Sequence, residues 1–200
     1  MDSISKKNVS PSIRNLNGET GCRSMGKKKI FLLRHEQRGS SVSFDTPLTP
    51  RGLQRAEKIV CPRLEERNID VIYSSPFVRT LQTIKPFCMK SGLKVNLEWS
   101  LVESIPVIEP NCDKFVDIIN PNYKPFLGYT TPANTDIIEF DGLKKRVQKF
   151  IESLDRSQNI LLVTHMPVIN AILSYKGVQL IEMYTPHQPG TLLSISGDTL

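Results

Sequence analysis

Short apolar runs, bounded by polar or charged residues, divide the chain into candidate strands. These runs lie at 30–33, 70–73, 93–97, 160–163 and 191–195. Each is shorter than a typical helix, and the continuous apolar character of 30–33 and 160–163 is typical of a strand that is buried on both faces. The pattern therefore predicts short strands in a buried, largely parallel sheet.

Helical patterns separate these strands, and we expect helices over 50–64, 76–87 and 137–154 and another that begins at Met166. Thr49 followed by Pro50 fits an N-cap with proline at the first helical position, and Ser75 with Pro76 repeats this pattern. Pro62 is expected to bend or shorten the first helix. Alternating strands and helices predict an α/β fold, a three-layer α/β/α sandwich around a largely parallel sheet.

Two segments lack such patterns. Residues 1–26 are polar and basic with few apolar side chains, so we expect a disordered tail. Residues 104–136 are rich in Pro, Asn, Tyr and Thr and show little periodicity, which predicts an irregular insertion or lid. The expected organisation is one folded domain over 27–200, with Tyr123, Phe126 and Tyr129 of the insertion either at a substrate mouth or in the core.

Charge and cysteine content narrow the function classes. The chain has a net charge of +6, but residues 1–29 carry seven basic and two acidic side chains, which leaves the body nearly neutral. We therefore expect no nucleic-acid partner, and an interaction through the tail would weaken steeply with salt. No apolar run is long enough to span a membrane. The four cysteines form no CxxC pair, which predicts no zinc site, reduced thiols and a cytoplasmic location.

Polar residues of chemical interest follow three of the predicted strands. Arg34 and His35 come after the first, Ser74 to Arg79 after the second, and His165 after the run at 160–163. The carboxyl ends of parallel strands share one edge of a sheet, where helix N-termini favour anions. Imidazole can attack phosphorus, and guanidinium groups match phosphate oxygens in pairs, so this edge is predicted to handle phosphate.

Four blocks of the sequence resemble the histidine phosphatase superfamily, also called the phosphoglycerate mutase-like family, and specifically its branch 1. They are LRH at 33–35, TPLTPRGLQRA at 46–56, SSPFVRTLQT at 74–83 and LVTH at 162–165. The blocks stand in the family's order and spacing and cover about residues 28–175. A single Arg-His pair would carry little weight, whereas four ordered blocks are specific.

The resemblance implies a metal-independent phosphatase without a cofactor. It implies that His35 is the nucleophile and becomes phosphorylated, that Arg34 and Arg79 hold the phosphoryl oxygens, and that His165 donates to the same group. Arg38 matches a second arginine found in some members, which implies a further phosphate ligand. The expected substrate is a phosphorylated small molecule or a phosphopeptide, and the oligomeric state is not predicted.

The resemblance also implies a carboxylic acid after the third strand that protonates the leaving group. Glu103 best matches that position, and Glu98 is the alternative. His187 is expected to be a loop residue, and Arg51 and Arg55 are expected to face solvent from the first helix.

Three departures from the family pattern bear on activity. Glu36 stands where glycine is usual, where its side chain could crowd the loop or bring negative charge near the phosphate. Gln37 replaces a frequent glutamate, and Met166 replaces another common glycine. They leave open a catalytically inactive member that binds a phosphorylated ligand. A phosphoglycerate mutase-like phosphotransferase is a second alternative, which the short polar segment at 39–45 disfavours.

Overall fold

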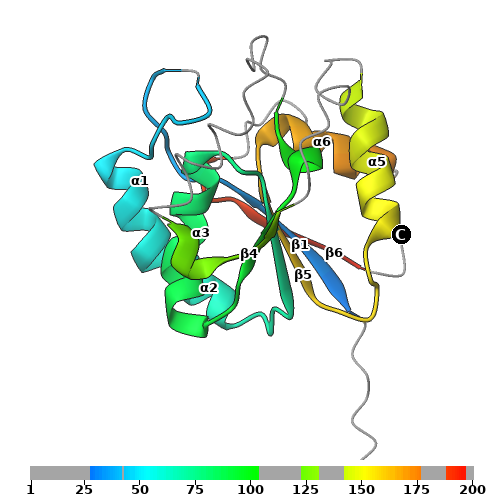
Figure 1. Ribbon diagram of the computed structural model, residues 1–200, viewed down its shortest axis with the longest axis horizontal. Helices are drawn as coiled ribbons and strands as arrows, with labels where there is room; N and C mark the ends of the chain where they lie inside the picture. Colours follow the sequence, from blue (N-terminus) through cyan, green and yellow to red (C-terminus); the bar gives the residue numbers. More distant parts are fainter. Residues whose placement is uncertain (1–27, 42, 104–122, 131–141, 177–187, 197–200) are drawn as a thin grey trace, which may run out of the picture.

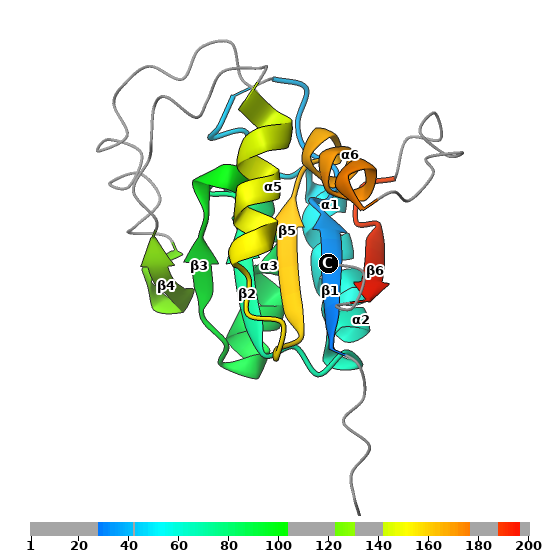
Figure 2. The same ribbon diagram turned by 90° about the vertical axis from the view of Figure 1, so that its right-hand side faces the viewer.

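The sheet of this protein has six strands, in the order β4-β3-β2-β5-β1-β6 (Figure 2). The computed structural model describes residues 28–41, 43–103, 123–130, 142–176 and 188–196. The strands are β1 (Lys29–Arg34), β2 (Val71–Ser74), β3 (Val95–Leu97), β4 (Leu127–Thr130), β5 (Ile160–Thr164) and β6 (Leu192–Ser196). All neighbouring pairs are parallel except β1 with β6. The predicted, largely parallel sheet is confirmed.

Helices cover both faces of the sheet, as Figure 1 shows. Helices α1 (Pro50–Arg55), α2 (Cys61–Glu65) and α3 (Val78–Ser91) lie on one face, and α5 (Leu143–Ser153) and α6 (Met166–Tyr175) lie on the other. Alternate residues of β1 point to opposite faces. Phe31 and Leu33 join the core under α2 and α3, while Ile30 and Leu32 join the core under α5 and α6. The three-layer sandwich is confirmed.

The first helix continues past its proline. Thr49 caps it as predicted, because its Oγ1 accepts the Gly52 N–H at 3.0 Å. Pro62 has no N–H and cannot complete the α-helical pattern. A π-helical segment, η1 (Ala56–Val60), lies just before it and leads into α2, so the chain accommodates the proline by widening the helix rather than ending it.

Helix α3 begins later than the Ser75–Pro76 signal indicated. Its N-cap is Phe77, without a side-chain cap. Ser75 is still tied to the sheet through its N–H, which donates to the Val163 carbonyl at 2.9 Å, and its hydroxyl contacts a histidine instead of capping a helix. The prediction of a Ser75 cap was wrong because a tertiary contact uses that side chain.

Part of the segment expected to be irregular has regular structure. A 3-10 turn, η3 (Lys124–Phe126), leads into β4, which pairs with β3 at the sheet edge. Tyr123 and Phe126 are buried in the core, so these two side chains do not form a substrate mouth. The tail over 1–26, the rest of the predicted insertion and His187 lie outside the described residues. Within the described ranges, no helix is both long and apolar enough to span a membrane.

Candidate active site

Three strand ends bring distant parts of the sequence together. Strands β2, β5 and β1 are adjacent and parallel, so their carboxyl ends meet at one edge of the sheet, at the top of Figure 2. In register, Arg34 of β1 pairs with Thr164 of β5, and Ser74 of β2 pairs with Val163. The next residues, His35, His165 and Ser75, therefore emerge side by side, and the predicted convergence is confirmed.

His35 is buried, with 4% of its surface exposed. Its Nδ1 lies 2.7 Å from the Glu36 carbonyl oxygen, and a carbonyl only accepts, so Nδ1 carries the proton and Nε2 holds the lone pair. Burial is the main cause that lowers the His35 pKa to about 3, and the positive charges of Arg79, Arg34 and Arg38 act in the same direction. At neutral pH the ring is an uncharged imidazole with one available nitrogen.

His165 lies edge-on to His35, with ring centroids 5.2 Å apart, and is fully buried. Its Nε2 is 2.9 Å from the Ser75 hydroxyl, which itself accepts the Phe77 N–H at 3.4 Å. The hydroxyl proton can then point at Nε2, which leaves the His165 proton on Nδ1. Among the described residues Nδ1 has no hydrogen-bond partner. Burial lowers the His165 pKa well below its usual value, so this ring is also neutral and offers a donor.

Arg79 supplies positive charge from the first turn of α3. Its guanidinium is buried, lies 4.5 Å from the centre of the Phe77 ring, and donates from Nη1 to the Ser43 carbonyl at 2.7 Å. Nη2 donates to the Glu103 carboxylate, while Nε has no partner among the described residues. Burial lowers the Arg79 pKa, and Glu103 opposes that shift. A buried donor without a partner carries a free-energy cost that a bound anion can remove.

Glu103 lies beside these groups, and Glu98 does not contact them. One Glu103 oxygen contacts Arg79 and lies 3.5 Å from His165 Nδ1. The Glu98 carboxylate instead accepts the Ser100 N–H at 2.7 Å, at the start of the 3-10 turn η2 (Trp99–Leu101). The Thr164 hydroxyl donates to the Leu101 carbonyl at 2.7 Å, which ties the segment before Glu103 to β5. Of the two carboxylates left open by the sequence, the structure brings only Glu103 to the histidines.

Arg34 and Arg38 are the other two arginines expected from the sequence to bind phosphate. Arg34 ends β1 and is partly buried, which lowers its pKa. Arg38 donates from Nη1 to the carbonyls of Gly39 and Ser41, at 2.9 and 2.6 Å, and so is turned toward its own loop. Its charge nevertheless reaches both histidines, because it contributes to lowering the pKa of each.

Glu36 is paired with Arg55 of α1. Its carboxylate is fully buried, and Arg55 Nε lies 3.2 and 3.0 Å from its two oxygens. Gly190, at φ +76°, packs so closely that a Cβ there would lie 2.0 Å from a Glu36 oxygen. The expectation that Arg55 is simply solvated was wrong. A buried carboxylate requires a counter-ion, so the burial of Glu36 is what calls for a basic partner such as Arg55.

These residues form a basic, mostly buried site around a neutral imidazole, His35. Guanidinium groups and the His165 N–H can surround the oxygens of a tetrahedral anion while His35 Nε2 faces its centre. Among the described residues, no three His, Cys, Asp or Glu side chains cluster in a way that could hold a metal ion. Ser75 and Ser43, which orient His165 and Arg79, were not identified from spacing because their contacts are tertiary.

Solved structures of several phosphatases share this fold. The ecdysone phosphate phosphatase from Bombyx mori, in complex with tungstate, is 15% identical, with 86% of this chain and 90% of that chain covered at a TM-score of 0.58. The phosphoserine phosphatase from Entamoeba histolytica is 22% identical, with 84% of this chain and 89% of that chain covered at a TM-score of 0.54. A mycobacterial glucosyl-3-phosphoglycerate phosphatase is 17% identical, with 84% of this chain and 89% of that chain covered, also at a TM-score of 0.54. At these identities the likeness establishes the fold alone.

No curated protein matches the chain in a sequence search. A family model does match it, over residues 30–197, and that range contains His35, His165 and the cluster around them. Together with the shared fold, this match establishes that the chain belongs to the histidine phosphatase superfamily, branch 1.

Proposed function

We propose that this protein is a metal-independent phosphatase that hydrolyses a phosphomonoester through a phosphohistidine intermediate on His35. The observation that carries the proposal is the Nδ1 hydrogen bond of His35, which leaves Nε2 as an unprotonated nitrogen in a basic site. Phosphoryl transfer requires in-line placement and positive charge around the equatorial oxygens. Arg34, Arg38 and Arg79 supply that charge, so the proposed reaction needs no metal.

In the first step His35 Nε2 attacks phosphorus, and an N–P bond forms as the bond to the ester oxygen breaks. His165 donates from Nδ1 to a phosphoryl oxygen, and Arg79 holds others. The Glu103 carboxylate, which contacts Arg79 in the free protein, takes up a proton from solvent as substrate binds and transfers it to the departing oxygen. Its contact with Arg79 and its 3.5 Å distance from His165 support this position beside the reacting group.

In the second step water attacks phosphorus and the N–P bond breaks. The Glu103 carboxylate takes a proton from that water, so the same residue serves as acid and then as base. Inorganic phosphate leaves, and both His35 and Glu103 return to their starting protonation states.

The substrate class that we propose is a phosphorylated small molecule or a phosphopeptide. The neighbours' names refer to phosphoserine, an ecdysone phosphate and a glucosyl phosphoglycerate, which share only the phosphomonoester. We also propose a cytoplasmic location, since the two cysteines among the described residues, Cys61 and Cys88, are free.

The test is hydrolysis of an aryl phosphate by the wild type and by His35→Ala, with and without a chelator. We expect activity that persists with the chelator and falls by at least about 1,000-fold in His35→Ala, because the nucleophile is lost. Quenching with alkaline denaturant during turnover should trap a base-stable, acid-labile phosphoprotein in the wild type only. Ligand titration with inorganic phosphate separates the inactive alternative, which would bind phosphate without forming a phosphoprotein.

A further inference from the structure

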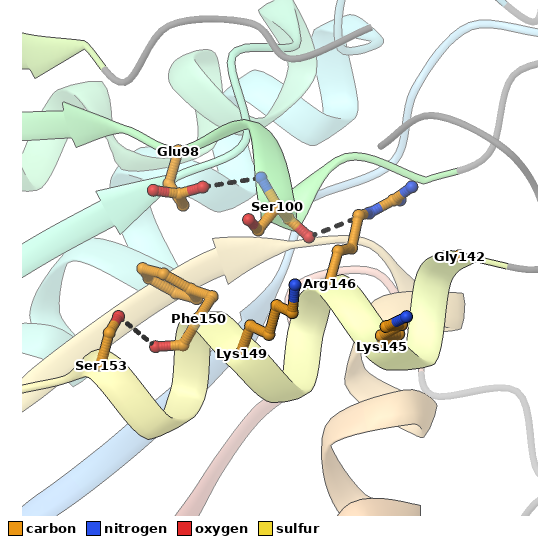
Figure 3. Close-up of a pocket in the computed structure, with 8 residues that line it drawn as sticks. All are labelled: Glu98, Ser100, Gly142, Lys145, Arg146, Lys149, Phe150 and Ser153. Carbon is orange, nitrogen blue, oxygen red and sulfur yellow. Dashed lines mark hydrogen bonds between the residues drawn. The ribbon is translucent and has the colours of Figure 1, made fainter. Parts of the chain in front are cut away.

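A cavity of about 460 Å³ lies between η2 and α5 (Figure 3). Glu98 and Ser100 line it on the η2 side, and Lys145, Arg146, Lys149 and Phe150 line it from α5. This volume is within the range of small-molecule sites. None of the six residues proposed for the phosphatase reaction lines the cavity.

The α5 wall of this cavity is strongly basic. Lys145 and Lys149 are exposed and lie one helical turn apart, where like charges destabilise a helix. Among the described residues, neither forms an ion pair. The nearby acid Glu152 accepts hydrogen bonds from Gln148 and Tyr175 instead. The two exposed lysines therefore place positive charge beside a concave space.

Arg146 adds a built, buried element to the same wall. It is 4% exposed, and burial lowers its pKa to about 10, so its charge persists at neutral pH. Its guanidinium donates from Nη2 to the Val102 carbonyl and from Nε to the Ser100 carbonyl at 3.4 Å. These two bonds fix the guanidinium at the wall of the cavity, beside Ser100.

We propose that this cavity is a second site, which binds a small anionic molecule that carries phosphate or carboxylate groups. Lys145 and Lys149 hold its charged end, with Arg146 behind them. Glu98 lies on the opposite wall, as Figure 3 shows, where its carboxylate repels an anion and accepts a hydrogen bond. The ligand that fits both walls has negative charge at one end and a hydroxyl or amine at the other.

Occupation of the site is coupled to turnover, an extension that rests on the proposed function. The segment 100–103 belongs to both places, because Ser100 lines the cavity and Glu103 contacts Arg79. An anion beside Arg146 competes with the carbonyls of Ser100 and Val102 for the guanidinium. Loosening these bonds displaces the segment that carries Glu103, so binding lowers kcat.

Citrate, a tricarboxylate with a hydroxyl group, and pyrophosphate are the probes, and amide NMR of the labelled full chain is the primary measurement. We expect saturable shifts at residues 145–149 of α5, with affinity about tenfold or more weaker in Lys145→Ala/Lys149→Ala.

Lys58→Ala/Lys144→Ala is the matched control, since it removes two exposed lysines outside the cavity and should leave the affinity unchanged. Glu98→Gln should bind pyrophosphate more tightly. If only pyrophosphate shifts the resonances, the site binds phosphate groups, and if only citrate does, it binds carboxylate groups.

Shifts confined to residues around His35, or equal affinities in the two double variants, overturn the proposal. Steady-state kinetics distinguishes the two sites. A probe that competes with substrate at His35 raises KM, whereas a probe bound in the cavity lowers kcat. We expect the kcat effect of citrate to disappear in Lys145→Ala/Lys149→Ala, and an effect that persists there contradicts the coupling. If the protein hydrolyses no phosphomonoester, the NMR titration still tests the cavity, so the two failures are distinguishable.

Discussion

At the scale of single residues, the position of the proton on each histidine ring decides which ring nitrogen is available. The Glu36 carbonyl accepts from His35 Nδ1, which leaves Nε2 without a proton, and the Ser75 hydroxyl plays the reciprocal part for His165. Two chemically identical side chains, with ring centroids 5.2 Å apart, thereby differ in the nitrogen that carries the proton, which suits the proposed tasks of nucleophile for His35 and donor for His165. Neither assignment depends on the residue type alone.

The role of Glu103 predicts a dependence on the leaving group. Glu103→Gln removes the acidic proton, so we expect kcat to fall about 100-fold with an alkyl phosphate and less than about tenfold with p-nitrophenyl phosphate, whose leaving group needs little protonation. Steady-state kinetics with both substrates measures this difference. Glu98→Gln is the matched control and should retain kcat with both substrates. Equal losses with the two substrates in Glu103→Gln would contradict the acid role.

The Glu36–Arg55 pair predicts non-additive effects on stability. Arg55→Ala leaves a buried carboxylate without its counter-ion, and we expect a loss of about 2 kcal/mol, reduced from fully buried pairs because Arg55 is partly exposed. In a Glu36→Gln background the same change should cost about 0.5 kcal/mol. Urea unfolding of the four proteins measures the cycle. Additive losses would show that the pair contributes no coupling.

At the scale of elements, α1 supports the loop that follows His35. The Gln37 carbonyl accepts the Thr49 N–H at 2.9 Å, and a Cβ at Gly52 would lie 2.3 Å from that same oxygen. The helix thus approaches the loop so closely that only glycine fits at this position. The position of His35 depends on this packing as well as on β1.

Gly52→Ala is therefore expected to damage both stability and activity. The clash with backbone should lower the free energy of unfolding by about 2–3 kcal/mol and should reduce kcat by displacing the loop. Thermal unfolding and turnover are the measurements.

Gly92→Ala is the control, because Gly92 has φ +75° at the end of α3 with open space around it. It should cost about 1 kcal/mol through backbone strain and leave kcat unchanged. A normal kcat in Gly52→Ala would contradict the support role.

At the scale of the whole molecule, the buried histidines link stability to pH. The His35 pKa is about 3 in the folded protein against an ordinary value of 6.5, so the unfolded chain binds more protons in this interval. The free energy of unfolding should therefore fall as pH decreases from about 6.5 toward about 3, and the His165 shift acts in the same direction.

His35→Asn should make this pH dependence shallower, because one of the two groups with a lowered pKa is removed. Urea unfolding at about pH 7 and about pH 4.5 compares the variant with the wild type. Lys58→Ala, which changes an exposed charge on η1, is the control and should keep the wild-type slope. An unchanged slope in His35→Asn would show that His35 is not held neutral in the folded protein.

Much of the architecture was accessible from local pattern. Apolar runs located the central strands β1 and β5, because a strand that is buried on both faces is apolar throughout. Partly apolar runs located β2, β3 and β6 to within a few residues. Strand β4 was missed, since Leu127–Thr130 is short, contains glycine and pairs only with β3.

By itself, the sequence determined the fold class, the family resemblance and the residue types for phosphate chemistry, because strand periodicity and motif spacing are local properties. Tertiary structure decided which groups meet. It brought Glu103 and not Glu98 to Arg79, used Ser75 to orient His165, and paired Glu36 with Arg55. It also enclosed a basic cavity under α5. Proton positions, ion pairs and cavities arise from contacts between segments that are distant along the chain, and spacing does not encode those contacts.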